Sequence, residues 1–514
     1  MTSTSRRTLL RAGLAAGGAG LLAACDPAGP NPAGSGPAVH HGGSASPGSA
    51  GGLVIPGGFV SPDGAEVRAA EAARHPGRVR DFRLTATAGR VDLGGRVVET
   101  WSYDGRVPGP PIRVTAGEVV RATLVNRLPA ETTLHWHGIA LRNDADGAPH
   151  LTQPPVAPGA EFTYEFTAAR PGTYWLHPHA GAQLDRGLYA VLLVDDPQET
   201  LDYDDEWTVV LDDWLDGVTG TPDAALAKLQ DGAAHGEQGG SGSSEVLGGP
   251  GGDVIHPYYL LNGRLPAHPE TFRARPGSRL RLRLVNAGAD TAFRVALGGH
   301  RMTVTHTDGF PVQPVETDAL LLGMGERYDV LVELDDGVFP LVALAEGKKG
   351  AAFGLVRTGA GTAPKPKVRP AALDGHLAGY DELAPAESVR LDDREPDQVI
   401  QMELTGGTTS YSWGFNGRPL THDKLAEHLV PIQAGQRIQL DLVNSTHMWH
   451  PVHLHGHTFA IGSSSGPRKD TVNVLVEEAV SVLFEADNPG LWVLHCHNIY
   501  HAESGMTAAL GYRR

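Results

Sequence analysis

Ten histidines and one cysteine fall into four short clusters with the spacing of metal ligands. The clusters are His135-Trp136-His137, His177-Pro178-His179, residues 450–455 with three histidines, and His495-Cys496-His497 followed by His501 and Met506. Imidazole and thiolate side chains are ligands of zinc and copper in proteins. One group of clusters lies before residue 180 and the other after residue 449. The sequence therefore predicts metal binding by segments that are far apart in the chain.

Alternate histidines in these clusters fit extended strands. On a strand, residues i and i+2 face one side and residue i+1 faces the other. His495 and His497 therefore point to one side of the backbone, while Cys496 points to the opposite side. His453 and His455 can join the histidine side. This arrangement predicts two metal centres that are a single residue apart along the chain.

Copper fits these clusters better than zinc does. A lone His-x-His pair is also compatible with unrelated surface histidines, and His-Cys-His alone is compatible with zinc. However, two histidines, one thiolate and a spaced methionine match the ligand set of blue copper sites. The eight further histidines exceed the needs of a structural zinc site.

The elements that must hold the clusters recur three times. Residues 117–126, GEVVRATLVN, recur as 277–286, GSRLRLRLVN, and as 435–444, GQRIQLDLVN. Each copy alternates apolar and polar residues between Gly and Asn, which is typical of a half-buried strand. The turn-rich segments that precede the copies are 107–111, 262–264 and 416–418.

Short strands separated by Gly and Pro turns predominate elsewhere, for example 161–166 and 191–194, and only 224–230 predicts a short helix. The fold is therefore predicted to be all-β, with three tandem β-sandwich domains. The expected parts are a signal at 1–25, a flexible tether at 26–75, domains at 76–197, 203–358 and 396–514, a Gly/Ser insert at 231–253 and a linker at 359–395.

The first 25 residues predict an export signal. Arg6 and Arg7 precede a small apolar run, as in twin-arginine signals, and the run ends in Leu22-Ala-Ala-Cys25, which resembles a bacterial lipobox. Plain cleavage beside an incidental cysteine is the alternative. We expect twin-arginine export, a lipid on Cys25, and a protein held on the membrane outside the cytoplasm, in the periplasm or at the cell surface.

The charge balance excludes one class of partner. The formal net charge is −17 at pH 7, and no basic stripe offsets it. Nucleic acid is therefore not an expected partner. We expect the chain to be a monomer.

The four clusters and the threefold repeat closely resemble the multicopper oxidases, in particular their three-domain laccase-like and copper-resistance branch. The resemblance runs from about residue 80 to the C-terminus. It implies cupredoxin-like Greek-key sandwiches, a copper-free middle domain and four copper ions. The implied ligands are His450, Cys496, His501 and Met506 for type 1 copper; His135 and His453 for type 2; and His137, His177 and His497, then His179, His455 and His495, for the two type 3 ions.

The resemblance also implies an activity. A reducing substrate gives single electrons, which pass through Cys496, His495 and His497 to the three-copper site, where four of them reduce dioxygen to water. Phenols, aromatic amines, Cu(I) and Fe(II) are the implied substrates, and oxidation of Cu(I) would contribute to copper tolerance. The chain has no methionine-rich insert, so the choice between organic substrates and Cu(I) stays open.

Two carboxylates are candidates for proton delivery. Relatives place an acid eleven residues after the first histidine of the His-Trp-His-Gly motif, which is Asp146 here. An ordinary loop aspartate is the alternative. Some bacterial members carry an acid directly after the last histidine, where this chain has Ala502. Glu503 stands where laccases and copper-resistance oxidases often have glutamate, and it either relays protons or orients a ligand.

Other functional classes are disfavoured. A non-enzymatic cupredoxin-fold scaffold or copper-binding protein would lack some ligands or have no use for the link between the two sites. A copper nitrite reductase-like enzyme would have two such domains and no complete set of eight histidines.

Overall fold

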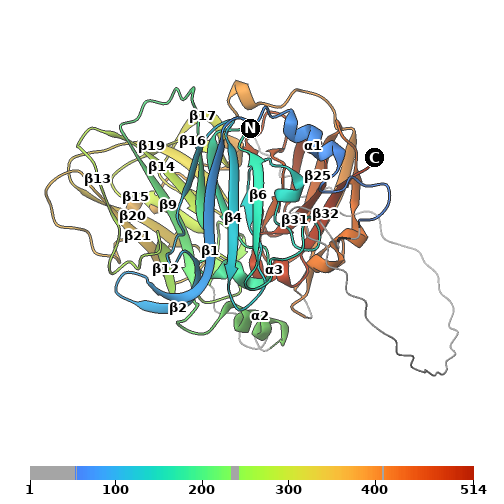
Figure 1. Cartoon of the computed structure of the whole chain (residues 1–514). Helices are drawn as coiled ribbons and strands as arrows, with labels where there is room; N and C mark the ends of the chain where they lie inside the picture. Colours follow the sequence, from blue (N-terminus) through green and yellow to red (C-terminus); the bar gives the residue numbers. More distant parts are fainter. Residues whose placement is uncertain (1–52, 54, 233–241, 408–409) are drawn as a thin grey trace, which may run out of the picture. The chain divides into compact units, whose positions relative to one another are not determined.

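The computed structural model describes residues 53, 55–232, 242–407 and 410–514. The predicted signal, Cys25 and most of the predicted tether lie outside the described residues. Strands predominate in the described part, which confirms the all-β prediction, and they run through the colour scale from blue to red in Figure 1. No helix among the described residues is long and apolar enough to cross a membrane.

The first domain contains two four-stranded sheets, in the orders β2-β1-β4-β6 and β3-β8-β7-β5. Their bounds are β1 Val79–Asp92, β2 Val97–Tyr103, β3 Ile112–Thr115, β4 Val119–Arg127, β5 His135–His137, β6 Glu161–Thr167, β7 Gly172–His177 and β8 Ala190–Asp195, with the 3-10 turns η1 Asn143–Ala145 and η2 Gly181–Asp185. The strands expected at 161–166 and 191–194 are confirmed as β6 and β8.

The second domain has a six-stranded sheet, β12-β9-β14-β19-β16-β17, and a five-stranded sheet, β13-β21-β20-β15-β18. The bounds are β9 Asp205–Trp214, β12 Tyr258–Leu261, β13 Thr271–Arg273, β14 Arg279–Asn286, β15 Phe293–Leu297, β16 Met302–Thr307, β17 Phe310–Thr317, β18 Leu320–Leu322, β19 Arg327–Glu333, β20 Val338–Ala345 and β21 Ala351–Arg357. The short helix expected at 224–230 is confirmed as α2, Pro222–Gln230, and β10 Ser243–Ser244 pairs with β11 Gly249–Pro250.

The third domain repeats this plan in sheets β23-β22-β25-β30-β27-β28 and β24-β32-β31-β26-β29. The 3-10 turns η3 Ala371–Asp374, η4 Tyr380–Glu382 and η5 Glu387–Val389 precede it. The bounds are β22 Gln398–Gly406, β23 Trp413–Phe415, η6 His422–His428, β24 Val430–Ile432, β25 Arg437–Asn444, β26 His450–Leu454, β27 Phe459–Ile461, β28 Arg468–Lys469, β29 Thr471–Val474, β30 Ala479–Glu485, β31 Leu491–Cys496, α3 Ile499–Glu503 and β32 Thr507–Tyr512.

The three copies of the sequence repeat occupy the same place in their sheets. β4, β14 and β25 each pair in parallel with the first strand of their domain and antiparallel with a later strand. The asparagine that ends each copy is buried, and its side-chain amide donates to one backbone carbonyl of the loop directly beyond it and to at least one carbonyl of a later segment: Asn126, Asn286 and Asn444. This amide fixes the loop that leads from the repeat to the position of the first histidine cluster.

The turn before the repeat has the same backbone geometry in all three domains. In the first domain, however, it lies at other residues than the sequence predicted. Asn262 and Asn416 adopt φ of 50° and 54°, each followed by a glycine with positive φ. Their counterpart is Asp104-Gly105, with φ of 52° and 73°, and not the Pro-rich segment 107–111. Asp and Asn tolerate this left-handed conformation because their short polar side chains bond locally, and Asp104 accepts from the Thr85 N–H.

The prediction of a flexible tether at 26–75 is wrong for its last part, which is folded. Residues 65–72 form the helix α1, drawn in blue in Figure 1, and Val67 is only 1% exposed. Glu71 accepts hydrogen bonds from the backbone and hydroxyl of Thr167 in the first domain. Arg74 donates to Asn488 in the third domain. The segment has few apolar residues, so its sequence does not indicate a helix. Two polar side chains, Glu71 and Arg74, attach the segment to the first and third domains.

Hydrophobic packing also joins the domains. One cluster of buried side chains contains Trp175 of the first domain, Val210 of the second, and Val452 and Cys496 of the third. Val67 of α1 belongs to the same cluster. The apolar interior is therefore continuous across the boundaries at which the histidine clusters meet.

The substitution Val67→Ala tests whether α1 is docked. It removes two buried methyl groups and should lower the free energy of unfolding by about 1–2 kcal/mol, even though alanine favours the helix. Scanning calorimetry measures the fall in melting temperature, with exposed Ala69→Ser as the matched control. Equal melting temperatures for the two variants would contradict the docking.

Candidate metal centres

Strand pairing brings the histidine clusters together in pairs. In the first domain, β5 runs antiparallel to β7 and places His135 opposite His177. In the third domain, β26 runs antiparallel to β31 and places His453 opposite His495. The spacing of alternate histidines therefore positions two pairs of imidazoles on each sheet, as the sequence predicted.

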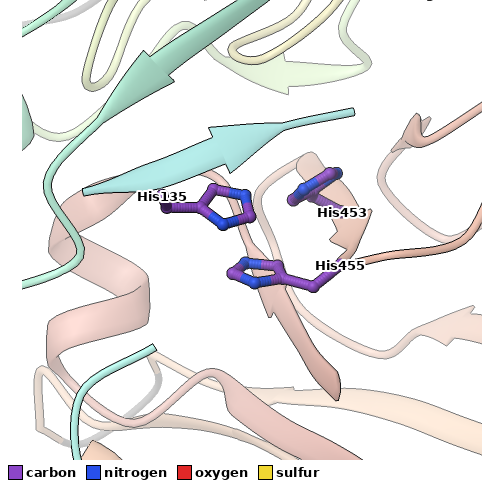
Figure 2. A group of neighbouring side chains, drawn as sticks. All are labelled: His135, His453 and His455. Carbon is purple, nitrogen blue, oxygen red and sulfur yellow. The ribbon is translucent and has the colours of Figure 1, made fainter. Parts of the chain in front are cut away.

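The two terminal domains then interleave their rings. His135 stacks on His455 with 3.7 Å between ring centroids, and Figure 2 shows these rings beside His453. His137 stacks on His453, also at 3.7 Å. Groups of these side chains have ligand atoms within 4.8 Å of one another: His135 with His453 and His455, His135 with His137 and His177, and His179 with His455 and His495. His497 lies 4.9 Å from His137 between ring centroids, so all eight histidines belong to one site.

Six rings of this site are oriented by a hydrogen bond from one nitrogen to an oxygen of the protein, whereas both nitrogens of His497 are buried without a hydrogen-bond partner. His135 Nδ1 donates to the Asp146 backbone oxygen, His177 Nδ1 to that of Pro178, and His495 Nδ1 to that of Cys496. The opposite nitrogens of His135 and His177 are buried without a hydrogen-bond partner. A metal ligand needs a deprotonated nitrogen aimed at the ion and a partner that fixes the other nitrogen. The donor set therefore fits copper.

Burial favours the neutral form of seven of these rings. Desolvation lowers the pKa of seven histidines below its usual value, and neighbouring imidazoles add to this effect: His137, His177, His179, His453, His455, His495 and His497. For His453, Asp470 opposes the fall in pKa without reversing it. A neutral imidazole is the form that binds a metal ion.

A second site lies on the other side of β31. Cys496 Sγ is 3.5 Å from His450 Nδ1 and 3.6 Å from His501 Nδ1, and the two nitrogens are 3.0 Å apart. Met506 is fully buried, and its backbone oxygen accepts from the Cys496 N–H. The remaining nitrogens are fixed by Thr446 on His450 and by Asp253 on His501, at 2.7 Å in each case.

The middle domain replaces histidine with apolar side chains at the equivalent positions. Val295 and Leu297 lie nine and eleven residues after Asn286, as His135 and His137 lie after Asn126, and both are fully buried. The middle domain nevertheless reaches the histidines with its backbone. A Cβ on Gly325 would lie 2.9 Å from both His137 Cε1 and His497 Cδ2.

Comparison with known proteins decides the family. Profiles of the multicopper oxidases match residues 85–199, 205–361 and 393–513. The chain belongs to the multicopper oxidase family. It is thus an oxidoreductase with copper as cofactor, which couples oxidation of reducing substrates to reduction of dioxygen, and its three domains are cupredoxin-like.

Individual relatives cover most of this multicopper oxidase. It is 47% identical over 459 residues to multicopper oxidase MmcO of Mycobacterium tuberculosis, covering 87% of this chain and 90% of the relative. A copper resistance protein A homolog of Pseudomonas syringae pv. tomato is 27% identical, covering 83% and 91%. Among solved structures, a laccase from Botrytis aclada matches with a TM-score of 0.71 and 25% identity, covering 85% of this chain and 88% of that one.

Asp146 lies at the histidine site of this oxidase. Its carboxylate accepts from His455 Nδ1 at 2.9 Å, while its backbone oxygen accepts from His135. The side chain is fully buried, and its Oδ1 atom has no hydrogen-bond partner. Asp146 therefore joins one histidine of the first domain to one of the third.

Glu503 lies further away and meets a residue that sequence reasoning missed. Its Oε1 is 3.4 Å from Nε2 of His422, and the ring of His422 packs edge-on against His179 with centroids 4.7 Å apart. His422 begins η6 and has no histidine within the usual ligand spacing, so no local pattern identifies it.

Two further carboxylates escaped the sequence analysis. Asp253 ends the Gly/Ser insert, where no ligand could be assigned, yet it accepts from His501 Nε2 and from the Tyr411 hydroxyl. Asp470 lies between clusters three and four and accepts from His137 Nε2 at 3.1 Å. A Lys-Asp-Thr triplet between two strands gives no signal of this contact, because His137 is 333 residues away.

Proposed function

We propose that this oxidase holds four copper ions in the two sites and that reducing equivalents enter at His501. The proposed ligands are His450, Cys496, His501 and Met506 for type 1 copper; His135 and His453 for type 2; and His137, His177, His497, His179, His455 and His495 for the type 3 pair. The observation that carries the proposal is the geometry of β31: Cys496 faces one site and its two flanking histidines face the other.

Bound copper supplies one-electron redox chemistry, with electrons taken up at the type 1 site and dioxygen reduced to water at the three-copper site. Cys496 and the adjacent His495 and His497 provide the shortest covalent connection between the two sets of ligands. Trp413 packs on His501 with centroids 4.2 Å apart, and burial excludes water from the ring. The residues around the type 1 site therefore shield the thiolate from solvent while Asp253 orients His501.

Electron entry is proposed at the Asp253–His501 edge. His501 is buried, whereas the Asp253 side chain is 15% exposed, so the carboxylate connects the ligand to the surface. A carboxylate at this point attracts cationic donors such as Cu(I) and Fe(II) and accepts a hydrogen bond from a phenol or an aromatic amine. The names of the copper resistance relatives support a contribution to copper tolerance. Oxygen uptake with Cu(I), Fe(II) and a phenol, compared as kcat/KM, ranks these donors.

Proton supply is proposed at Asp146. Its unpartnered, buried Oδ1 is free to hold a proton close to the histidines, and its Oδ2 stays bonded to His455. Glu503 is proposed as a positioning residue that acts on His179 through the ring of His422.

The proposed location is outside the cytoplasm. Arg6 and Arg7 and the lipobox-like end at Cys25 support twin-arginine export and a lipid anchor in the periplasm or at the cell surface. We propose that the enzyme acts as a monomer, because a single chain gathers the clustered ligands without a contribution from a second copy.

Replacing the thiolate tests the site assignment. Cys496→Ser should abolish the intense blue absorption and oxidase turnover, because serine does not form the copper–thiolate bond. Cys25→Ser, at the only other cysteine, is the matched control and should keep the colour. Absorption spectra and oxygen uptake measure the effect. Turnover retained by Cys496→Ser would reject the assignment.

Replacing Asp146 tests proton supply. Asp146→Asn keeps an oxygen for His455 but cannot deliver a proton, so reduction of dioxygen should slow by about 10²-fold while the blue colour persists. Rapid mixing of the reduced enzyme with dioxygen measures the rate. Asp144→Asn, on the same loop and paired with Arg142, is the control. Equal rates in the two variants would remove Asp146 from proton delivery.

Replacing Cys25 tests the anchor. In a bacterial host, Cys25→Ser should shift the exported protein from the membrane fraction to the soluble fraction, because the acylated thiol is lost. Fractionation and immunoblotting measure the distribution, with Cys496→Ser as the control that keeps the anchor. Unchanged membrane association of Cys25→Ser would contradict lipid attachment.

A further inference from the structure

A buried carboxylate lies between histidines of the two terminal domains. Asp470, between β28 and β29, is fully buried. Its Oδ1 accepts from His137 Nε2 at 3.1 Å, and its backbone oxygen accepts from His453 Nδ1 at 2.9 Å. The opposite nitrogens, His137 Nδ1 and His453 Nε2, are buried without a partner. Asp470 thus determines which nitrogen of each ring is available to a metal ion.

The middle domain supplies the cation for this carboxylate. Arg327, the first residue of β19, donates from Nη1 and Nη2 to the two oxygens of Asp470, each at 2.7 Å. Its Nε donates to the backbone oxygen of Thr173 in the first domain. Arg327 is fully buried. It belongs to the second domain and bonds residues of the first and third, so it connects all three domains. A bidentate guanidinium fixes the plane of a carboxylate, which a lysine ammonium does not.

Neighbouring groups hold the pair in place. Asp308 of the middle domain accepts from the backbone N–H of Arg327 and from that of Asp470. Gly138, directly after His137, has φ of 88°, and a Cβ there would collide with Arg327 Nη2 and Asp470 Oδ2. Only glycine fits both the backbone conformation and the space. The last residue of the His-Trp-His-Gly motif therefore makes room for this ion pair.

Asp146 and Asp470 are arranged reciprocally. Each accepts with its backbone oxygen from a histidine of its own domain and with its carboxylate from a histidine of the other terminal domain. The two carboxylates differ in whether a cationic side chain pairs with them. Within the described part of the chain, Asp470 is paired with Arg327, and no arginine or lysine forms an ion pair with Asp146. Asp470, which is paired with Arg327, is suited to holding a histidine ring in a fixed orientation. Asp146, which has no such partner, is suited to the proton supply proposed for it.

We propose that Arg327 and Asp470 form a positioning pair through which the copper-free middle domain orients His137 and His453 for copper. The inference rests on the ligand assignment of the proposed function. Arg327 donates to both oxygens of the Asp470 carboxylate. Asp470 therefore acts on the histidine rings only as a hydrogen-bond acceptor. Neither residue touches the reacting atoms.

The double variant Arg327→Gln/Asp470→Asn replaces the buried ion pair by two neutral amides and avoids leaving one charge unpaired. We expect the blue absorption of the type 1 site to persist. Type 2 copper should dissociate into a chelator about 10–100-fold faster, and its paramagnetic resonance spectrum should change, since supporting residues contribute that much to metal binding. Arg327→Lys, which keeps the charge without the fork, should show the same changes to a smaller degree and serves if the double variant does not fold.

The matched control is Arg186→Gln/Asp216→Asn. This pair is also buried, with Nη1 of Arg186 donating to both carboxylate oxygens of Asp216, and it joins the first and second domains. It should release type 2 copper at the rate of the unchanged enzyme.

The outcomes separate this inference from the proposed function. If the unchanged enzyme lacks the blue absorption or holds fewer than four copper ions, the proposed function fails. If the unchanged enzyme holds four, and both Arg327 variants match the Arg186 control in copper release and in the type 2 spectrum, the positioning role is wrong while the proposed function stands.

Discussion

The stacking of His135 on His455 and of His137 on His453 is the contact on which the rest of the structure depends. Each stack joins the first domain to the third, and all four rings are at most 1% exposed. Burying a polar nitrogen without a partner costs on the order of 1–3 kcal/mol. Several such nitrogens converge here, and a bound metal ion would satisfy them. The surrounding structure must in turn keep the domains together.

The surrounding structure provides that support from several directions. Glu71 of helix α1 bonds the first domain, and Arg74, two residues past the end of the helix, bonds the third. The hydrophobic cluster around Cys496 and Val452 continues into the first and second domains. Burial alone would raise the pKa of Asp470, but Arg327 outweighs it and holds that pKa below its usual range. The carboxylate therefore stays ionised and keeps accepting from His137, while the backbone oxygen of Asp470 accepts from His453.

The parts of the site that depend on local spacing were predictable from the sequence. Alternation places Cys496 opposite His495 and His497, and the threefold repeat locates the strands that lead to the clusters. The parts that depend on contacts between distant segments were not. Asp470 meets His137 and Arg327 across domain boundaries, and Asp253 meets His501 from a Gly/Ser insert. The helix α1 was missed for a related reason: Glu71 bonds Thr167, which is 96 residues away, and only Val67 of the helix is buried.

The middle domain has a larger role than a spacer of the same fold. Its apolar Val295 and Leu297 fill the positions where the terminal domains have histidines, so it cannot bind copper there. Yet it contributes a group to each site: Asp253 fixes His501 beside Cys496, and Arg327 fixes Asp470 beside His137 and His453. Because the middle domain does not have to accommodate a metal ion in its own core, it can direct charged side chains at the sites of the other domains. Ligands and the groups that orient them are thereby divided between domains, and each site is complete only when all three are assembled.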